Sequence, residues 1–320
     1  MEIPANKLAP RLQWPVLTRN LLAGFTRNLT LAAAIGPYAG KETGETALLR
    51  RLIRYLCKGD VLVADRYFCN YWLVASLMSF GIDVCFRQVA SRQGTFKKGK
   101  RFGRDDHELI WYRPHRSAWM SREFYEALPE RIVVRRLRCV VNTPGREQKP
   151  FVIITTLTQA RGPAAVSYES VAELYSFRWN AELDIRNIKT FLNLNHVRCK
   201  SPDMVHRELW TTLLAYNLIR VTIATSASLH DRKPRELSFV IACQFVLAAW
   251  QELPTMQDAQ SRTDYCSIVL TRLSECVVGR RPGRIEPRVL KKRKDQYRLM
   301  TQPRHELRRR LKAGDNSFEN

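Results

Sequence analysis

The residue types best suited to chemistry lie together in one short segment of this sequence, from Tyr175 to Lys189. If the segment is a helix, with about 100° between successive residues, a narrow strip of roughly 60° holds Tyr175, Arg178, Glu182 and Lys189. A carboxylate on such a strip can bind a metal ion, and the cations beside it can bind phosphates. This layout suits a site that acts on a nucleic-acid backbone. The alternative is a plain ion pair between Arg178 and Glu182, which adds only a few tenths of a kcal/mol to a solvated helix.

A second acid, Asp65, directly follows the apolar run Val61–Ala64. Such a run is typical of a strand buried on both faces, and α/β sheets place functional groups just beyond the carboxyl ends of their strands. The alternative is an ordinary turn or helix N-cap carboxylate. Phosphodiester chemistry with two divalent ions needs acidic oxygens from different elements, which hold the ions about 3.5–4 Å apart. Asp65 and Glu182 are therefore the candidate catalytic residues and metal ligands, with Mg²⁺ or Mn²⁺ as the expected cofactor.

The overall charge favours a polyanionic partner. The 320 residues include 53 Lys and Arg against 30 Asp and Glu, a net charge of +23, and 45% of them are hydrophobic. That hydrophobic share is ordinary for a globular protein, whereas a balance this basic points to nucleic acid. No apolar run is long enough to span a bilayer. We therefore expect a cytoplasmic protein that acts on nucleic acid and has no membrane partner.

The eight cysteines do not form a recognisable zinc site. None is part of a CxxC pair, and the six histidines are scattered. Buried free thiols in a reducing compartment are the expected state.

Apolar and amphipathic stretches predict the elements that position the two acids. The first part of the chain predicts strands at 29–35, 61–64 and 82–87, with helices at 45–57 and 70–80. Strand, helix and apolar strand in this order indicate a βαβ unit, so we expect an α/β sheet. β-forming residues then predict a β-rich module inserted into this core, with strands at 109–112, 131–141 and 151–157. Helices are expected at 171–192, 204–224 and 237–252.

Two motifs resemble a known family. The segment Val63-Ala64-Asp65-Arg66-Tyr67-Phe68 resembles the second-aspartate segment of the IS-four-type DDE transposases, bacterial insertion-sequence enzymes related to the Tn-five transposase. The strip residues match that family's Y-R-E-K signature in both residue type and spacing. Weaker family-like segments lie at 34–38, 214–220 and 281–288, so the resemblance runs from about residue 27 to about residue 304.

The resemblance implies a fold and a reaction. The fold would be an RNase H-like core interrupted by a β-rich insertion domain, with a helical C-terminal region and a basic tail. Asp65 would be the second and Glu182 the third carboxylate of a catalytic triad, while DNA phosphates would be bound by Tyr175, Arg178 and Lys189. Relatives cut double-stranded DNA at inverted repeats and join the freed 3′-hydroxyl to target DNA, generally as homodimers. This implies a nucleoid-associated protein in a bacterial cytoplasm.

The same resemblance gives a domain division. An unassigned leader (1–26) precedes the first part of the RNase H-like core (27–87), the insertion domain (88–157) and the second part of the core (158–228). A C-terminal helical region (229–279) and a basic tail (280–320) follow. In relatives a tryptophan of the insertion domain stacks on a flipped base. Trp111 and Trp119 are the candidates here, with core packing as the alternative.

Two basic stretches outside the strip are further candidates for DNA contact. Lys97 and Lys98 lie in the insertion. Residues 280–312 carry fourteen Lys and Arg against three Asp and Glu, a net +11. Such a tail is either a soluble end or an arm drawn to the phosphate backbone. The candidate residues in it are Arg281, Arg284, Arg288, Lys291, Lys292 and Arg293.

One expected residue is missing. The family's first aspartate lies well before the second, but no Asp occurs in residues 1–59, and Asp60 lies at the wrong end of the 61–64 strand. The sequence therefore predicts an incomplete triad in a chain that begins near the third strand of the family fold. Three functions stay open: a metal-dependent transposase, a non-catalytic DNA-binding remnant that inhibits a full-length transposase, or another two-metal nuclease on the same fold.

Overall fold

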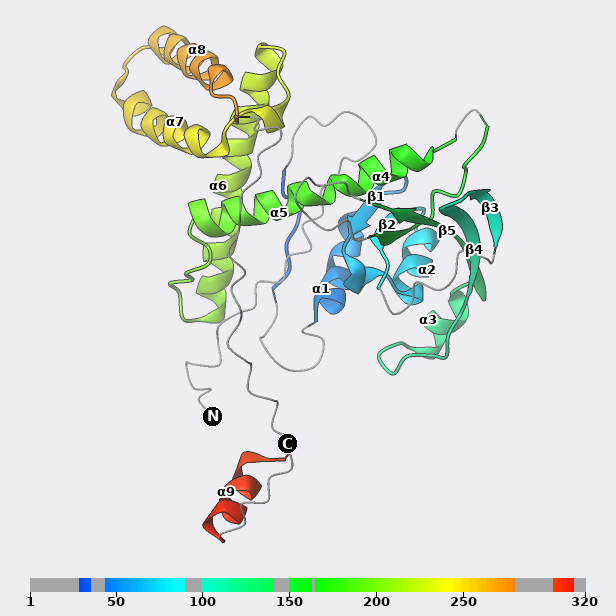
Figure 1. Ribbon diagram of the computed structural model, residues 1–320. Helices are drawn as coiled ribbons and strands as arrows, with labels where there is room; N and C mark the ends of the chain where they lie inside the picture. The colour runs from blue at the N-terminus through cyan, green and yellow to red at the C-terminus, as the bar shows by residue number, and fades with distance from the viewer. Residues whose placement is uncertain are drawn as a thin grey trace, which may run out of the picture. The chain divides into compact units, whose positions relative to one another are not determined.

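The computed structural model describes residues 29–35, 44–89, 99–140, 150–162, 165–279 and 302–313. The chain divides into two compact units, residues 1–280 and residues 281–320. The first unit contains a β-sheet with helices on it and a set of long helices (Figure 1). In the second unit, the described residues form the helix α9 (Arg304–Lys312).

Among the described residues, one six-stranded mixed sheet has the order β1-β2-β6-β5-β4-β3. Its strands are β1 (Val61–Ala64), β2 (Asp83–Arg87), β3 (Lys100–Gly103), β4 (Asp106–Tyr112), β5 (Arg131–Cys139) and β6 (Phe151–Thr155). β1 and β2 are parallel, and all the other neighbouring pairs are antiparallel. The predicted α/β class is therefore confirmed.

The helices of the first unit alternate with short helical turns. The α-helices are α1 (Glu45–Leu52), α2 (Tyr71–Ser79), α3 (Arg122–Ala127), α4 (Tyr168–Ser176), α5 (Arg178–Arg186), α6 (Pro202–Leu229), α7 (Phe239–Glu252) and α8 (Ala259–Glu275). The 3₁₀ turns are η2 (Ile53–Tyr55), η3 (Arg66–Phe68), η6 (Pro234–Glu236) and η7 (Leu253–Thr255). A π-helical turn, η5 (Asn187–Phe191), directly follows α5.

The predicted βαβ unit is present as β1, α2 and β2. The side chain of Asn70 accepts a hydrogen bond from the backbone N–H of Leu73, 3.0 Å away, and so caps the start of α2. Alternate residues of β2 face opposite sides of the sheet, as the strand period of two requires: Val84 and Phe86 belong to one core cluster and Cys85 to another. The predicted strand 61–64 and helix 70–80 agree closely with the structure.

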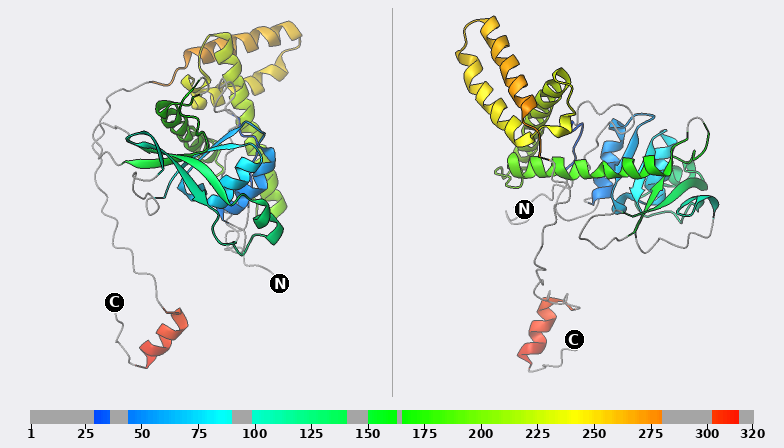
Figure 2. Two further views of the ribbon diagram at one scale, coloured as in Figure 1. Left: turned by 90° about the vertical axis from the view of Figure 1, so that its right-hand side faces the viewer. Right: turned by 45° about the horizontal axis from the view of Figure 1, so that its top comes forward.

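Helices cover both faces of the sheet where β1, β2 and β6 lie. α1 and α2 pack on one face through residues that include Leu49 and Val74, and α4 packs on the other through Val171 and Leu174. A separate core forms among α6, α7 and α8, which lie together beside the sheet (Figure 2). The first unit therefore has a sheet region and a helical region, each with its own buried apolar core.

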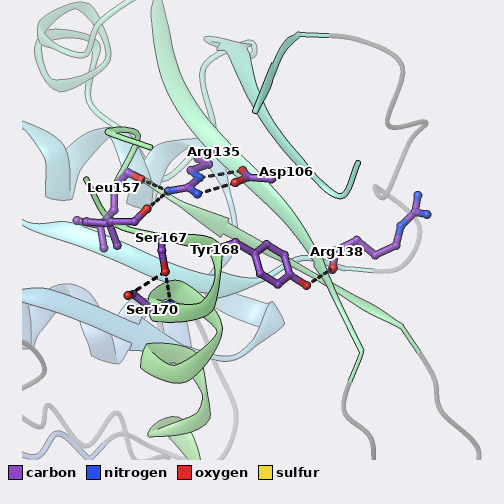
Figure 3. A network of polar contacts seen from close by, with 8 residues as sticks. Asp106, Arg135, Arg138, Leu157, Ser167, Tyr168 and Ser170 are labelled. Carbon is purple, nitrogen blue, oxygen red and sulfur yellow. Dashed lines mark hydrogen bonds and ion pairs between the residues drawn. The ribbon is translucent and has the colours of Figure 1, made fainter. Parts of the chain in front are cut away.

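Strands β3 to β6, which cover most of the predicted insertion, extend the same sheet as β1 and β2. Arg135 of β5 forms a buried ion pair with Asp106 of β4 and also bonds to the chain that leads into α4 (Figure 3). The guanidinium of Arg135 donates to both carboxylate oxygens of Asp106, at 2.8 and 2.6 Å, and to the carbonyl of Val166 at 2.6 Å. The Tyr168 hydroxyl donates to the carbonyl of Arg138 at 2.7 Å. These contacts fix where α4 begins relative to β5.

The predicted strand at 29–35 is wrong. The segment is described, but it has no strand structure. The backbone N–H and carbonyl of Thr30 bond instead to the side-chain amide of Asn217 on α6, at 2.9 and 2.8 Å. Ala32 packs into the sheet core, while Ala33 and Ile35 pack against the helical core. An amide side chain thus takes the backbone bonds that a neighbouring strand would otherwise make.

All eight cysteines are free thiols, as the sequence predicted, but only Cys69, Cys85 and Cys139 are buried, so the expected burial is wrong for the other five. Among the residues that the structure describes, no helix is long and apolar enough to cross a membrane.

Candidate functional site

The strip residues lie on a nearly continuous helical run formed by α4, α5 and η5. Figure 1 shows α4 and α5 end to end, joined at Phe177, which keeps a right-handed helical backbone (φ −65°, ψ −16°). Tyr175 comes from α4, Arg178 and Glu182 come from α5, and Lys189 comes from η5. The predicted helix 171–192 is confirmed, with two irregularities that the sequence pattern did not predict.

Asp65 directly follows β1 and starts the 3₁₀ turn η3. Its Oδ1 accepts the backbone N–H of Arg66 at 2.7 Å, so the turn-capping role is real. Because β1 and β2 are parallel, their carboxyl ends meet at one edge of the sheet. Ala64 pairs with Phe86, so Arg87 at the end of β2 lies at the same edge as Asp65. The acid therefore stands at the position where α/β sheets collect functional groups.

The structure brings Asp65 into the electrostatic neighbourhood of the strip. Burial raises the pKa of Tyr175 to about 12, and the charge of Asp65 adds to this shift, while Arg178 opposes it. The charge of Asp65 also contributes to the pKa of Arg178. Two segments more than a hundred residues apart in sequence thus converge on one site.

Arg178 is the cation common to both acids. Its Nη1 donates to Oε1 of Glu182 at 2.5 Å, with the two side chains 25% and 41% exposed. Burial acts to lower the pKa of Arg178, but the hydrogen bond to Glu182 and the nearby negative charges outweigh it, so the pKa rises above its ordinary value. The plain i,i+4 ion pair that the sequence left open is therefore present, and it lies at the same site as Asp65.

Two buried polar atoms of this site lack a hydrogen-bond partner among the described residues: the hydroxyl of Tyr175 and the Nε of Arg178. The ring of Tyr175 is packed in the core, 5.6 Å from the ring of Phe151, and the residue is 7% exposed. Leaving a buried donor unpaired costs about 1–3 kcal/mol. Such groups in a polar site are what an anionic ligand would satisfy.

The remaining predicted site residues differ in their placement. Lys189 is half-buried in η5, and the π-turn shifts it from the phase of a regular α-helix. Trp111 lies on β4 and packs against the sheet core. Trp119 is 43% exposed, with the guanidinium of Arg50 4.2 Å from its ring centroid. Core packing therefore accounts for Trp111, whereas Trp119 offers a ring to the surface.

Eight predicted DNA-binding residues lie outside the described part of the chain: Lys97, Lys98, Arg281, Arg284, Arg288, Lys291, Lys292 and Arg293. They stay predictions.

Sequence reasoning missed two features of the site. Arg87 adds a cation at the edge that holds Asp65, and its charge acts on Tyr175. The signal was available, because residues that follow two parallel strands of one βαβ unit end at the same edge. The second feature is Asp184, buried on α5 two residues from Glu182 and paired with two arginines of the helical region.

The carboxylates of this site are too few to enclose a divalent cation by themselves. Within the described residues, no group of three or more His, Cys, Asp and Glu side chains could hold a metal ion. Mg²⁺, however, is commonly bound through one or two carboxylates with water and substrate phosphate as its other ligands. Asp65 and Glu182 would be ligands of that incomplete kind, and they do not fit an all-protein metal site.

Comparison with known proteins identifies the family. A family model described as Transposase DDE domain matches residues 26–218, and the chain belongs to this family. It is also similar to a curated protein of Escherichia coli (strain K12), the transposase InsG for insertion sequence element IS4. The two are 28% identical over 282 residues, which cover 85% of this chain and 59% of that relative. The resemblance inferred from the Y-R-E-K spacing is thereby confirmed, and the chain spans about three fifths of the relative it matches.

Proposed function

We propose that this protein is a DNA transposase of an insertion sequence, with its working site at the carboxyl edge of β1 and on the α4–α5 helix. The observation that carries the proposal is the packing of β1 against the α4–α5 run: Val63, two residues before Asp65, lies in one core cluster with Tyr175 and Phe177. Arg178, which follows Phe177, pairs directly with Glu182. Family membership supports the same function. The substrate would be double-stranded DNA with the inverted repeats of the element, together with target DNA, and a homodimer would hold two ends.

Asp65 and Glu182 would hold Mg²⁺ or Mn²⁺, which would supply an activated water or hydroxyl nucleophile and neutralise the leaving oxygen. Phosphate oxygens would complete the metal's ligands. With a phosphate in place, Arg178 would be shared between Glu182 and the DNA, and its unpaired Nε would gain an acceptor. The hydroxyl of Tyr175 would donate to the same backbone, and Lys189 and Arg87 would add positive charge.

The proposal is tested with the purified full chain and duplexes that carry the DNA flanking the coding frame. We expect Mn²⁺-dependent nicking at the element ends that Glu182→Ala abolishes, while Arg186→Gln, an exposed change on the same helix, leaves it unchanged. Nicking that survives Glu182→Ala would contradict the role of Glu182.

A second function, non-catalytic DNA binding, is favoured by one specific observation: the described residues offer no three-ligand metal group, while the chain carries a net +23. Such a protein would bind DNA without metal, with an affinity that falls steeply as salt rises. It would act by pairing with a full-length transposase. Metal-independent binding without nicking would favour this function, and loss of binding after deletion of residues 280–312 would assign the DNA contact to the tail.

A further inference from the structure

Helix α5 carries Glu182, yet it has little apolar anchorage of its own. Asp184 is the buried residue of α5, 1% exposed, and the other residues of the helix are half-buried or exposed. A buried carboxylate is unfavourable unless it is paired and hydrogen-bonded. The attachment of this helix therefore depends on what holds Asp184.

Two arginines hold it. Arg235 of η6 donates from Nη1 to Oδ1 and from Nη2 to Oδ2 of Asp184, both at 2.6 Å. Arg220 of α6 donates from Nη2 to Oδ1 at 2.7 Å. A bidentate pair of this kind fixes the orientation of both groups as well as their distance.

The helical region holds the second arginine rigidly in turn. Arg220 is 4% exposed, and its Nε donates to the hydroxyl of Tyr216 at 2.9 Å. Its guanidinium lies 5.4 Å from the ring centroid of Phe239, the first residue of α7. Asp184 is therefore attached to α6, η6 and the start of α7 through one compact polar cluster.

Asp184 and Glu182 lie on different faces of α5, so the attachment at Asp184 affects where Glu182 points. With 3.6 residues per turn, side chains two residues apart point about 200° apart, so Glu182 and Asp184 lie on opposite faces of α5. The helix is also interrupted at both ends, by Phe177 and by the π-turn η5. Rotation of this nine-residue segment about its axis would change the direction of the Glu182 side chain, and the bidentate pair at Asp184 opposes that rotation.

We propose that Asp184, held by Arg220 and Arg235, is a positioning residue that fixes the rotation of α5 and with it the direction of the Glu182 side chain. The consequence for the reaction rests on the proposed function of Glu182. The anchoring of α5 itself does not.

Hydrogen exchange measured by mass spectrometry on the full chain tests the anchor. The variant is Asp184→Asn, which keeps the shape and removes the charge. The matched control is Asp106→Asn, which does the same to the buried pair with Arg135 in the sheet region. In Asp184→Asn we expect exchange across residues 178–186 to rise on the order of tenfold or more, with peptides of β2 and β6 unchanged. In Asp106→Asn the increase should fall on β4, β5 and residues 157–166, with α5 unchanged.

Unchanged exchange in α5 of Asp184→Asn would overturn the proposal, and so would an equal rise in every peptide, since that is a global loss of stability. If Asp184→Asn does not fold, Arg235→Gln is the second variant, because Arg235 is partly exposed and Arg220 still pairs with Asp184. Arg235→Lys keeps the charge and one donor, so it should restore most of the protection that Arg235→Gln loses.

Mn²⁺ binding followed by electron paramagnetic resonance separates the anchor from the function. If Glu182→Ala weakens Mn²⁺ binding, we expect Asp184→Asn to weaken it several-fold as well. The control Asp106→Asn should leave Mn²⁺ binding unchanged. A wild-type chain that binds no Mn²⁺ would contradict the proposed metal site, and the exchange result would still decide whether Asp184 anchors α5. If Glu182→Ala weakens Mn²⁺ binding and Asp184→Asn leaves it unchanged, the positioning role is overturned.

Discussion

Helix α5 carries two acids two residues apart, and the structure surrounds them in contrasting ways. Asp184 faces the helical region, is 1% exposed, and accepts from three guanidinium N–H groups of two arginines. Glu182 lies about 200° around the helix from Asp184, is 41% exposed on its side chain, and pairs with Arg178. Beside it, the hydroxyl of Tyr175 has no partner among the described residues.

The contrast distinguishes a site that holds the fold together, at Asp184, from the site proposed to act on DNA, at Glu182. The Asp184 cluster resembles the Asp106–Arg135 pair of the sheet region, since both are buried carboxylates with bidentate arginine partners. Such clusters hold elements in place. The sheet edge instead combines a partly exposed acid–cation pair with two buried donors that lack a partner among the described residues, a combination that contributes little to stability. The predictions below test this division through opposite effects on stability and on DNA binding.

The largest expected effect belongs to Asp184→Ala. Removing one partner of a buried ion pair leaves the other charge uncompensated, so the free energy of unfolding should fall by about 3–5 kcal/mol. Urea unfolding monitored by circular dichroism measures the change. A loss no larger than that of an exposed substitution such as Arg186→Gln would show that the cluster is not a structural site.

Next comes Arg135→Met in the sheet region, which leaves Asp106 and the Val166 carbonyl without their donor. We expect a loss of about 3 kcal/mol in the free energy of unfolding. The double variant Asp106→Leu/Arg135→Met should recover much of that loss, because no buried charge is left alone. A double variant that loses the sum of the two single effects would contradict this explanation.

Tyr175→Phe should have the opposite sign. The change removes a buried hydroxyl without a partner among the described residues, so we expect a gain of about 1 kcal/mol in the free energy of unfolding. At the same time the affinity for duplex DNA should fall, as measured by fluorescence anisotropy. A loss of both stability and affinity would mean that the hydroxyl has a structural partner.

The same residue predicts a dependence on pH. Burial raises the pKa of Tyr175 from 10.0 to about 12 in the folded chain. As pH rises between these values, the unfolded chain loses the proton while the folded chain keeps it, so unfolding becomes easier. The wild type should therefore lose stability relative to Tyr175→Phe as the pH rises from about 10 to about 12. A constant difference between the two proteins over this window would contradict the buried, protonated hydroxyl.

The smallest effect on stability is expected for Glu182→Gln. Its ion pair with Arg178 is partly exposed, and pairs of this kind contribute about 0–1 kcal/mol. Thermal unfolding should hardly change, while Mn²⁺-dependent nicking should disappear. A large drop in the melting temperature would place Glu182 with Asp184 in the structural class and remove the contrast.

Local patterns in the sequence predicted much of this fold. The run Val61–Ala64, the helix at 70–80 and the helix at 171–192 are defined by apolar periodicity and caps, which depend on near neighbours. Segment 29–35 has the apolar composition of a strand, but its Thr30 bonds to Asn217, which lies 187 residues further along the chain. No local pattern contains that information.

The candidate site was also predictable where it depends on local sequence, and it was not predictable where it depends on distant partners. The Y-R-E-K spacing lies within one helix, and Asp65 follows an apolar strand, so both appear in the sequence. Asp184 looks like any surface acid of an amphipathic helix, because its partners Arg220 and Arg235 lie 36 and 51 residues further on. In the π-turn before Lys189, Ile188 packs into the helical core, a contact with residues distant in sequence.

The central claim is that Asp65 and Glu182 hold one divalent cation at the sheet edge. Anomalous diffraction from crystals of the full chain with duplex DNA and Mn²⁺ tests it most directly. We predict a manganese peak bound by both carboxylates and by a phosphate oxygen. Carboxylates too far apart to share an ion, or DNA bound with no manganese between them, would contradict the claim and favour a protein that binds DNA without cutting it.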